Sequence, residues 1–408
     1  MTGRGALASL GGVIATGAPA HGLRLADPGC LAGALADALS GGPPVAPLPA
    51  ESTERQRVVE MLQPDRAVVQ ADAAVVVATS GSTGQPKGVV LSRPAIRASV
   101  TATHARLGGG GSWLLALPEH YVAGLMVVAR AVLAGTGCHR VGSDLAGLAG
   151  VVAQLDGRRY ISLVPTQLVR ALGDPNTVAA LATCDAILLG GGPADPHLLA
   201  TAHDHQLHVV TTYGMSETCG GCVYDGVPLD GVDVDLDPDG QIFIAGPVLF
   251  SGYHHAPELT RPSLGEHGFR TSDRGAWVDG RLLLTGRTDQ VIISGGLNVD
   301  LGEVERVASA WTALAGAELV IIGVPDADWG TMVVAVTDAS DTFITAEGLR
   351  QQVETRLPPY AAPRRLVHVG TLPRTTNGKL DRQRLVRDLM PTRAPSPPPP
   401  RDATGNRP

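Results

Sequence analysis

The stretch ATSGSTGQPKG, residues 78–88, combines four hydroxyl side chains and three glycines with a single lysine. Glycine-rich turns let backbone N–H groups approach an anion, hydroxyls add donors, and Lys87 adds positive charge. These are the components of a phosphate-binding loop. The spacing is not that of a Walker loop, because Lys87 follows Pro86 and precedes Gly88 instead of standing before Ser or Thr. Composition alone leaves a flexible Gly/Ser connector as the alternative.

Other short stretches place charged residues in predicted loops. YGMSET puts Glu217 just after an apolar run, where a carboxylate could help to hold Mg²⁺ on the phosphates of a nucleotide. RTSDRGAW carries Asp273, GRTDQ carries Arg287 and Asp289, and RTTNGKLDR carries Lys379 after a Thr-Asn-Gly turn. Each stretch is weak evidence by itself, because acids and lysines are ordinary in solvated loops.

The elements that must position these residues show a repeated pattern from about Ala73 to Gly214. The apolar runs AAVVVA, YISLV, DAILLG and LHVVTT are each followed by a loop of small or polar residues and then by helical periodicity. This alternation predicts a parallel sheet with helices on its faces. Ligands bind such sheets beyond the carboxyl ends of the strands, so we expect the loops to converge at that edge.

The pattern changes after Gly226. Two segments, GVDVDLDPDGQIFIAGPVL and WVDGRLLLTGR, are typical of β-hairpins, and helices and strands of a small α+β unit follow. The predicted fold class is therefore α/β. It comprises a large N-terminal domain (1–287) with mostly parallel sheets, flanking helices and a β-rich segment, and a small α+β C-terminal domain (288–390). The Pro-rich tail (391–408) is expected to be disordered.

Composition excludes several classes of protein. The net charge of −7, the pI near 5.9 and the 3% aromatic content argue against a nucleic-acid-binding surface. The apolar stretch 121–134 is too short to span a membrane and contains Arg130, so we expect a buried helix. The apolar run near the N-terminus is broken by Ser9, Gly11 and Gly12, which argues against a signal peptide.

The five cysteines suggest no disulfide framework and fit a reducing cytosol, so a cytoplasmic location is expected. Cys219 and Cys222 have C-x-x-C spacing, but no second pair completes a zinc site. Two ordinary buried thiols are the favoured interpretation.

Taken together and in order, the motifs ATSGSTGQPKG, LLGGGPA, YGMSET, TSD, GRTDQVIISGG and RTTNGKLDR resemble those of the adenylate-forming enzymes. This superfamily contains acyl-CoA synthetases, non-ribosomal adenylation domains and luciferases. The matches run from about residue 78 to residue 382. The short N-terminal part, with SLVPTQLVRAL and TYGMSETCGGCVYDGVPLDG, looks most like the branch of 2-succinylbenzoate–CoA ligases of menaquinone biosynthesis.

The resemblance implies an ATP-dependent acid–CoA ligase that uses ATP, Mg²⁺ and coenzyme A. Lys379 would bridge the substrate carboxylate and the α-phosphate, Glu217 would bind Mg²⁺, and Thr218 would contact the α-phosphate. The implied ATP-binding residues are Thr79, Ser80, Gly81, Ser82, Thr83, Gly84, Lys87, Gly190, Gly191, Gly192, Tyr213, Gly214, Met215, Ser216, Asp273 and Arg287.

The family also implies a mobile C-terminal domain that swings about Asp289. After the swing, Ser294, Gly295 and Gly296 would face the pantetheine arm of coenzyme A. A family habit of homodimers suggests the same state here.

For the second carboxylate of 2-succinylbenzoate, Arg170 is the candidate partner, because a guanidinium can bind a carboxylate at two points. A surface arginine at a helix start is the equal alternative. Gln167 lies three positions earlier on the same predicted helical face. LPEHYVAG reverses the family's aromatic–His order, so either His120 or Tyr121 takes the acyl-pocket position; Tyr121 is the predicted acid-binding residue.

Two alternatives to this function stay open at this point. One is an adenylating enzyme for another aryl or acyl acid, which could load a carrier protein. The other is a nucleotide-binding homologue without catalysis. The presence of Glu217, Asp273, Arg287 and Lys379 together argues against the second alternative.

Overall fold

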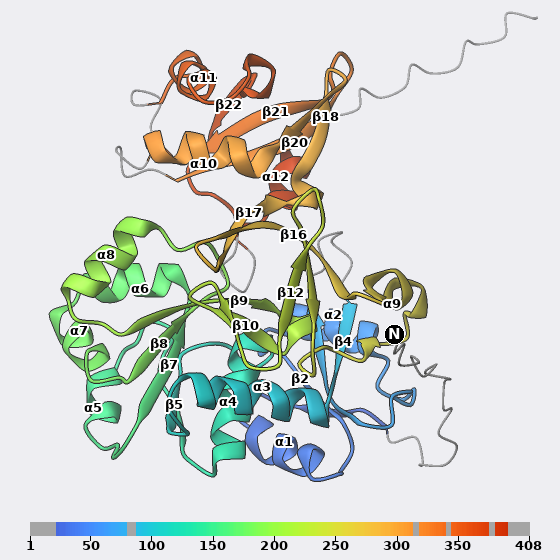
Figure 1. Cartoon of the computed structure of the whole chain (residues 1–408), viewed down its shortest axis with the longest axis vertical. Helices are drawn as coiled ribbons and strands as arrows, with labels where there is room; N and C mark the ends of the chain where they lie inside the picture. Colours follow the sequence, from blue (N-terminus) through green and yellow to red (C-terminus); the bar gives the residue numbers. More distant parts are fainter. Residues whose placement is uncertain (1–21, 80–86, 313–317, 340–343, 375–379, 391–408) are drawn as a thin grey trace, which may run out of the picture. The chain divides into compact units, whose positions relative to one another are not determined.

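A computed structural model describes residues 22–79, 87–312, 318–339, 344–374 and 380–390. The chain forms two compact units (Figure 1). The larger unit takes the described residues up to Thr271 together with Gly275–Leu283, and the smaller takes Ser272–Arg274 together with those from Leu284 onward. The predicted boundary at 287/288 stays a prediction. The predicted disordered tail lies outside the described residues.

A five-stranded sheet opens the larger unit. Its strands, in spatial order, are β1 (Arg24–Ala26), β2 (Val45–Pro47), β3 (Ala73–Thr79), β4 (Lys87–Ser92) and β14 (Gly252–Tyr253). The first three strands are parallel, whereas β4 is antiparallel to both β3 and β14. The side chains of Val75, Val76 and Val77 are fully buried. Because successive strand residues point to opposite faces, this sheet must be covered on both sides.

A seven-stranded sheet forms the second half of the larger unit. Its spatial order is β11 (Val227–Pro228), β10 (Gly220–Tyr224), β9 (Val209–Met215), β8 (Ala186–Leu189), β7 (Arg159–Leu163), β5 (Ser112–Leu115) and β6 (Cys138–Arg140). The strands from β9 to β6 are parallel, as the alternation of apolar runs and helices predicts. β10 and β11 add an antiparallel edge.

Helices fill the space between the two sheets and cover their outer faces (Figure 1). The largest core joins both sheets to α1 (Leu31–Leu39), α3 (Arg93–Arg106) and α4 (Val122–Ala134). α2 (Ser52–Leu62) packs on the outer face of the five-stranded sheet. The outer face of the other sheet packs against α5 (Leu148–Val152), α6 (Pro165–Leu172), α7 (Pro175–Leu181) and α8 (Pro196–Asp204). The predicted buried helix is α4, in which Arg130 is buried.

The predicted β-rich segment is a third sheet. Its main path is β12 (Asp233–Leu236), β13 (Gln241–Ala245), β16 (Gly268–Val278) and β15 (Leu264–Gly265), and β17 (Arg281–Arg287) pairs with β16. Both predicted hairpins are present, with their turns at Asp239-Gly240 and Asp279-Gly280. α9 (Pro257–Ser263) precedes β15, and the β16–β17 hairpin contributes residues to both compact units.

The smaller unit is built on a fourth sheet. Its strands are β19 (Leu297–Asp300), β18 (Val291–Ser294), β21 (Gly330–Thr337) and β20 (Leu319–Asp326), with β22 (Arg365–His368) parallel to β21. α10 (Leu301–Thr312) and α11 (Ala346–Glu354) share a core with one face, and α12 (Arg382–Leu389) packs on the other. The predicted α+β character of this unit is confirmed.

Two local expectations differ from the structure. The run AAVVVA is followed not by a helix but by the antiparallel strand β4, because KGVVLS contains the β-branched residues Val89 and Val90 and is buried after Lys87. The strands on either side of the glycine-rich stretch therefore belong to the five-stranded sheet, whereas YGMSET begins within the last residues of β9 in the seven-stranded sheet. After β9 the chain makes only a short 3₁₀ turn, η1 (Ser216–Thr218), before β10.

Candidate active site

The predicted phosphate loop is held between two paired strands. Residues 80–86, including the predicted Ser80, Gly81, Ser82, Thr83 and Gly84, lie outside the described residues. Its flanking residues Thr79 and Lys87 face each other across the β3–β4 ladder, and Thr79 Oγ1 donates to the Lys87 carbonyl at 3.3 Å. Because both strands are buried, the positions from which this loop starts and ends are fixed.

Lys87 and Glu217 meet although they come from different sheets. The Lys87 Nζ atom lies 2.8 Å from Glu217 Oε1, and the Glu217 side chain is only 9% exposed. The sequence places the two residues at the edge of one sheet. Their convergence is confirmed by contact, but it results from stacking of the two sheets around a shared helical layer.

Tyr253 completes this cluster and was missed by sequence reasoning. Its hydroxyl donates to Glu217 Oε1 and accepts from Lys87 Nζ, each at 2.8 Å. Tyr253 lies on the two-residue strand β14, opposite Val89 of β4. No local motif distinguishes SGYHH, so only the pairing of β14 with β4 could have identified it.

The turn that carries Glu217 is braced from within. Thr218 is fully buried, and its hydroxyl accepts from Met215 N at 2.9 Å and donates to Gly220 O at 2.7 Å. A Cβ on Gly214 would lie 2.0 Å from Gly220 O, so no larger residue fits there. The predicted contact of Thr218 with the α-phosphate stays a prediction, and in this structure its hydroxyl stabilises the turn.

The predicted adenine-binding residues lie at neighbouring strand ends. Gly190, Gly191 and Gly192 follow β8. Tyr213, Gly214 and Met215 end β9, which pairs with β8 in parallel, and Ser216 follows in η1. A Cβ on Gly190 would lie 2.3 Å from Thr212 Oγ1, which explains why a glycine stands there. The two motifs therefore lie side by side at the carboxyl edge, as the sheet pattern predicts.

In the smaller unit, Arg287 is bound by two carboxylates. Its Nη1 donates to Asp273 Oδ1 at 2.6 Å, while Nε and Nη2 donate to the two oxygens of Asp289 at 2.8 Å each. This bidentate pair holds the predicted hinge residue against the predicted ribose-binding arginine. The predicted catalytic Lys379 lies outside the described residues.

The predicted coenzyme A segment is the tight turn between β18 and β19. Gly295 and Gly296 have φ angles of +57° and +81°, a backbone conformation that favours glycine. Gly295 N donates to Trp329 O at 3.0 Å, and a Cβ on Gly295 would lie 2.8 Å from the Trp329 ring. Ser294 is buried before this turn.

The predicted acid-binding residues are separated by burial. Gln167 is buried, with Nε2 donating to Ala116 O at 3.0 Å and to Ser143 O at 2.9 Å, so it braces two loops. Arg170 is exposed in the last turn of α6. Gln167 and Arg170 lie three positions apart in α6, as predicted, but they differ in burial because the Gln167 amide turns inward to satisfy these backbone groups. Their roles in acid binding stay predictions.

The aromatic segment before α4 is ordered by stacking. The His120 and Tyr121 rings lie 4.0 Å apart, and the Tyr121 hydroxyl donates to Glu54 Oε1 at 3.0 Å. Burial lowers the pKa of His120 below its ordinary value.

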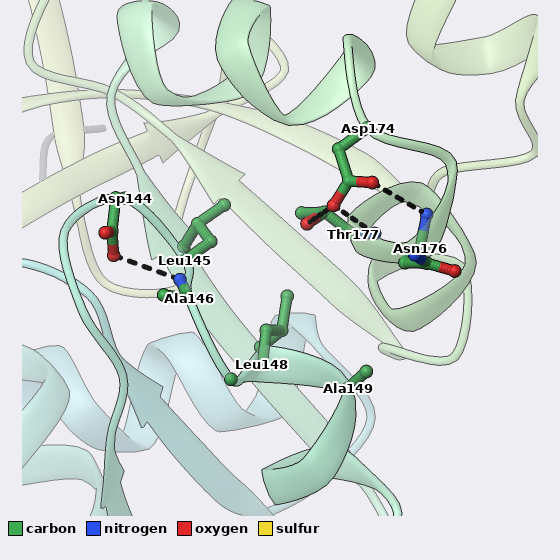
Figure 2. A pocket seen from close by; sticks show the side chains of 9 residues that line it. Asp144, Leu145, Ala146, Leu148, Ala149, Asp174, Asn176 and Thr177 are labelled. Atoms are coloured by element: carbon green, nitrogen blue, oxygen red, sulfur yellow. Dashed lines mark hydrogen bonds between the residues drawn. The ribbon is translucent and has the colours of Figure 1, made fainter.

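A pocket of about 200 Å³ between the 144–149 loop and the start of α7 holds none of the predicted site residues (Figure 2). Its aspartates cap local backbone: Asp144 accepts from Ala146 N, and Asp174 accepts from Asn176 N and Thr177 N. These carboxylates are already used in turns. The pocket therefore offers no chemistry comparable to that around Glu217.

The cysteines play the structural role expected of them. Cys219 and Cys222 are buried, and burial raises the pKa of each thiol, to about 12 for Cys222. No group of three or more metal-ligating side chains occurs within the described part of the chain. Nor does any described helix have the length and apolarity needed to cross a membrane.

Comparison with known proteins assigns these motifs to a family. A family model for AMP-binding enzymes matches residues 32–254, and one for the AMP-binding enzyme C-terminal domain matches residues 303–379. A probable 2-succinylbenzoate–CoA ligase of Mycobacterium tuberculosis strain H37Rv is 45% identical over 329 residues, covering 78% of this chain and 85% of that protein. A 2-succinylbenzoate–CoA ligase of Listeria monocytogenes serotype 4b is 33% identical, with 77% and 69% covered.

Solved structures agree with this similarity. The o-succinylbenzoate CoA synthetase of Bacillus subtilis, solved with an acyl-adenylate intermediate, has 27% identity and a TM-score of 0.68, covering 85% of this chain and 78% of that one. An amide bond synthetase of Marinactinospora thermotolerans, at 22% identity and a TM-score of 0.72, covers 92% and 91% and shows the fold alone.

Proposed function

This chain belongs to the family of AMP-binding enzymes, and from that premise we propose that it is an ATP-dependent 2-succinylbenzoate–CoA ligase. The observation that carries the proposal is the 45% identity to such a ligase over 78% of the chain. The product would enter menaquinone biosynthesis. Because the reaction consumes ATP and coenzyme A, we also propose a cytoplasmic location; a homodimer stays a prediction.

The reaction has two steps. A carboxylate oxygen of the acid attacks the α-phosphorus of ATP, and the bond to pyrophosphate breaks, which leaves an acyl-adenylate. The thiol sulfur of coenzyme A then attacks the acyl carbon, and AMP leaves with the electron pair of the broken C–O bond. The first step brings two anions together, so fixed cations and backbone donors must offset their repulsion.

Residues from several motifs would supply that array together. Lys87 would bind the β- and γ-phosphates beside the 80–86 loop, and Gly190–Gly192 with Tyr213 would frame the adenine. Lys379 would bridge the carboxylate and the α-phosphate, where charge concentrates during the first step. Asp273 and Arg287 would bind the ribose hydroxyls, Ser294–Gly296 would contact the pantetheine arm, and Arg170 would bind the second carboxylate of the acid.

Mg²⁺ fits the donor set at Glu217. Mg²⁺ is commonly bound through one or two carboxylates plus substrate phosphates rather than by a cage of protein ligands. Within the described part of the chain, both hydrogen bonds to the Glu217 carboxylate are accepted by Oε1 and none by Oε2. Bound there, the ion would neutralise charge on the departing pyrophosphate.

The test is pyrophosphate release with ATP and Mg²⁺ over a panel of acids. The panel contains 2-succinylbenzoate, benzoate, salicylate, a medium-chain fatty acid and several amino acids, each with and without coenzyme A. We expect turnover on 2-succinylbenzoate alone, rising with coenzyme A. Turnover on a different acid would overturn the proposed substrate and keep the chemistry. No release with any acid would favour the non-catalytic alternative.

A further inference from the structure

Tyr253 is placed with little freedom beside Lys87 and Glu217. It pairs with Val89 through the β14–β4 ladder, and its ring packs on Phe250 with the ring centroids 4.9 Å apart. The residue is only 5% exposed. The backbone and the ring thus fix where the hydroxyl lies before any ligand binds.

The hydroxyl closes a three-membered hydrogen-bonded cluster. Lys87 Nζ to Glu217 Oε1, Lys87 Nζ to Tyr253 Oη, and Tyr253 Oη to Glu217 Oε1 each measure 2.8 Å. A tyrosine hydroxyl has one proton to donate and lone pairs that can accept. Its one proton goes to Glu217, and its lone pair accepts from Lys87.

We propose that Tyr253 is a positioning residue that holds the Glu217 carboxylate in place when Lys87 turns to the nucleotide. This inference rests on the proposed function. In this structure, Lys87 is bound to the carboxylate that is assigned to Mg²⁺. To bind a phosphate, Lys87 must weaken that contact.

The consequence for Glu217 follows from its hydrogen bonds. Once Lys87 leaves, Tyr253 is the one described side chain that still bonds to Oε1. While the Tyr253 hydroxyl holds Oε1, the carboxylate keeps its orientation, and Oε2 can bind the cation. A carboxylate left without this donor would rotate more freely and bind Mg²⁺ less tightly.

Tyr253→Phe isolates the hydroxyl from the rest of the side chain. Phe keeps the packing on Phe250 and the Lys87–ring contact, in which Nζ lies 4.0 Å from the ring centroid. Tyr224→Phe is the matched control. Its buried hydroxyl lies 3.1 Å from Thr103 Oγ1 in the same core cluster and does not contact Glu217.

The composition of the chain provides a readout that does not depend on turnover. Lysine occurs only at Lys87 and Lys379, so lysine labelled at Cε and Nζ gives two side-chain signals in NMR spectra of the full chain. Lys379→Arg assigns them. In Tyr253→Phe without nucleotide, the Lys87 signal should shift from its wild-type position, because one hydrogen-bond acceptor is lost.

Titration of Mg²⁺ with ATP present, and with no acid, tests the positioning role itself. The Mg²⁺ concentration that moves the Lys87 signal halfway should rise about ten-fold in Tyr253→Phe, the scale of one hydrogen bond to a charged group. Tyr224→Phe should match the wild type. Equal Mg²⁺ dependence in the two variants would overturn the proposal, as would a wild-type Lys87 signal that ATP and Mg²⁺ leave unmoved.

A second measurement on the wild type covers the case in which Tyr253→Phe does not fold. The Tyr253 hydroxyl proton should stay hydrogen-bonded and protected from exchange with water as Mg²⁺ and ATP move the Lys87 signal, because its bond to Glu217 is retained although Lys87 no longer donates to the hydroxyl. Loss of that protection when the Lys87 signal moves would contradict the proposal. Neither measurement contains an acid. Their results therefore do not depend on whether the acid panel supports the proposed function.

Discussion

Lysine is used twice in this chain, at Lys87 and Lys379, and every other one of its 32 basic residues is arginine. The two cations differ physically: arginine offers a planar fork of donors, whereas lysine offers a compact, freely rotating ammonium. The geometry of a phosphoryl group changes during reaction, and the freely rotating ammonium of lysine can follow such a change. Lys87, at the start of β4, and Lys379 are both assigned to phosphate or carboxylate oxygens, which agrees with a demand for point charges at these positions.

Lys379→Ala should reduce adenylate formation by about 10²–10³-fold, the effect of removing one preorganised donor from a developing charge. Transfer of the acyl group from added acyl-adenylate to coenzyme A should stay near the wild-type rate, because Lys379 is assigned to the first step alone. Pyrophosphate release and thioester formation measure the two steps. Arg384→Ala, an exposed cation on α12, is the control, and equal loss of both steps in Lys379→Ala would refute the assigned role.

At the scale of elements, the site depends on how closely the β9–β10 hairpin turns. Gly214 pairs with Gly221, and the backbone of Gly220 occupies the space that a Cβ at position 214 would need. The turn places Glu217 just after the parallel strand β9, and the hydroxyl of the buried Thr218 stabilises the turn from inside. Backbone packing, rather than side-chain contact alone, thus sets the position of the carboxylate.

Gly214→Ala should destabilise the protein by about 1–3 kcal/mol, the usual cost of overpacking a rigid site. Gly150→Ala is the matched control, since a Cβ there, in α5, meets nothing within 4 Å. That change should be neutral or stabilise by about 0.5–1 kcal/mol, because alanine is the better helix former. Urea denaturation measures both, and an unchanged midpoint for Gly214→Ala would show that the hairpin can widen.

At the scale of the whole molecule, several histidines are kept neutral by burial. The pKa values of His104, His120, His254 and His255 all lie below the ordinary value, with burial as the main cause in each case. The unfolded chain therefore binds protons more readily than the folded chain. The stability that depends on these neutral rings is complete above a pH of about 6.5 and is lost as the pH falls further.

Acidification from pH 7.5 to pH 5.5 should therefore lower the Tm of the full chain. His254 is the test position, because its buried ring lies 2.8 Å from Leu62 O through Nε2. His254→Gln should flatten the dependence of Tm on pH, whereas the same change at the exposed His205 should leave it as it is. Thermal melts at three pH values measure this, and a Tm that holds or rises on acidification would contradict the expectation.

The signals that the sequence carries by itself are mostly local. Strands such as Ala73–Thr79 and helices such as α4 follow from the spacing of apolar residues, because periodicity and turn chemistry act over about ten neighbouring residues. The phosphate loop and Glu217 are predicted instead from the order of several short motifs along the chain.

How segments far apart in sequence meet depends on the tertiary structure. An apolar run that is buried on both faces carries no signal for which strand lies next to it. The sequence therefore did not predict that β3 and β9 belong to separate sheets. The same holds for Tyr253, whose place depends on a two-residue pairing with β4, and for Gln167, whose amide turned inward to backbone groups. Sheet stacking and hydrogen-bond satisfaction are properties of the assembled chain, because the groups that satisfy one another lie up to 192 residues apart in sequence.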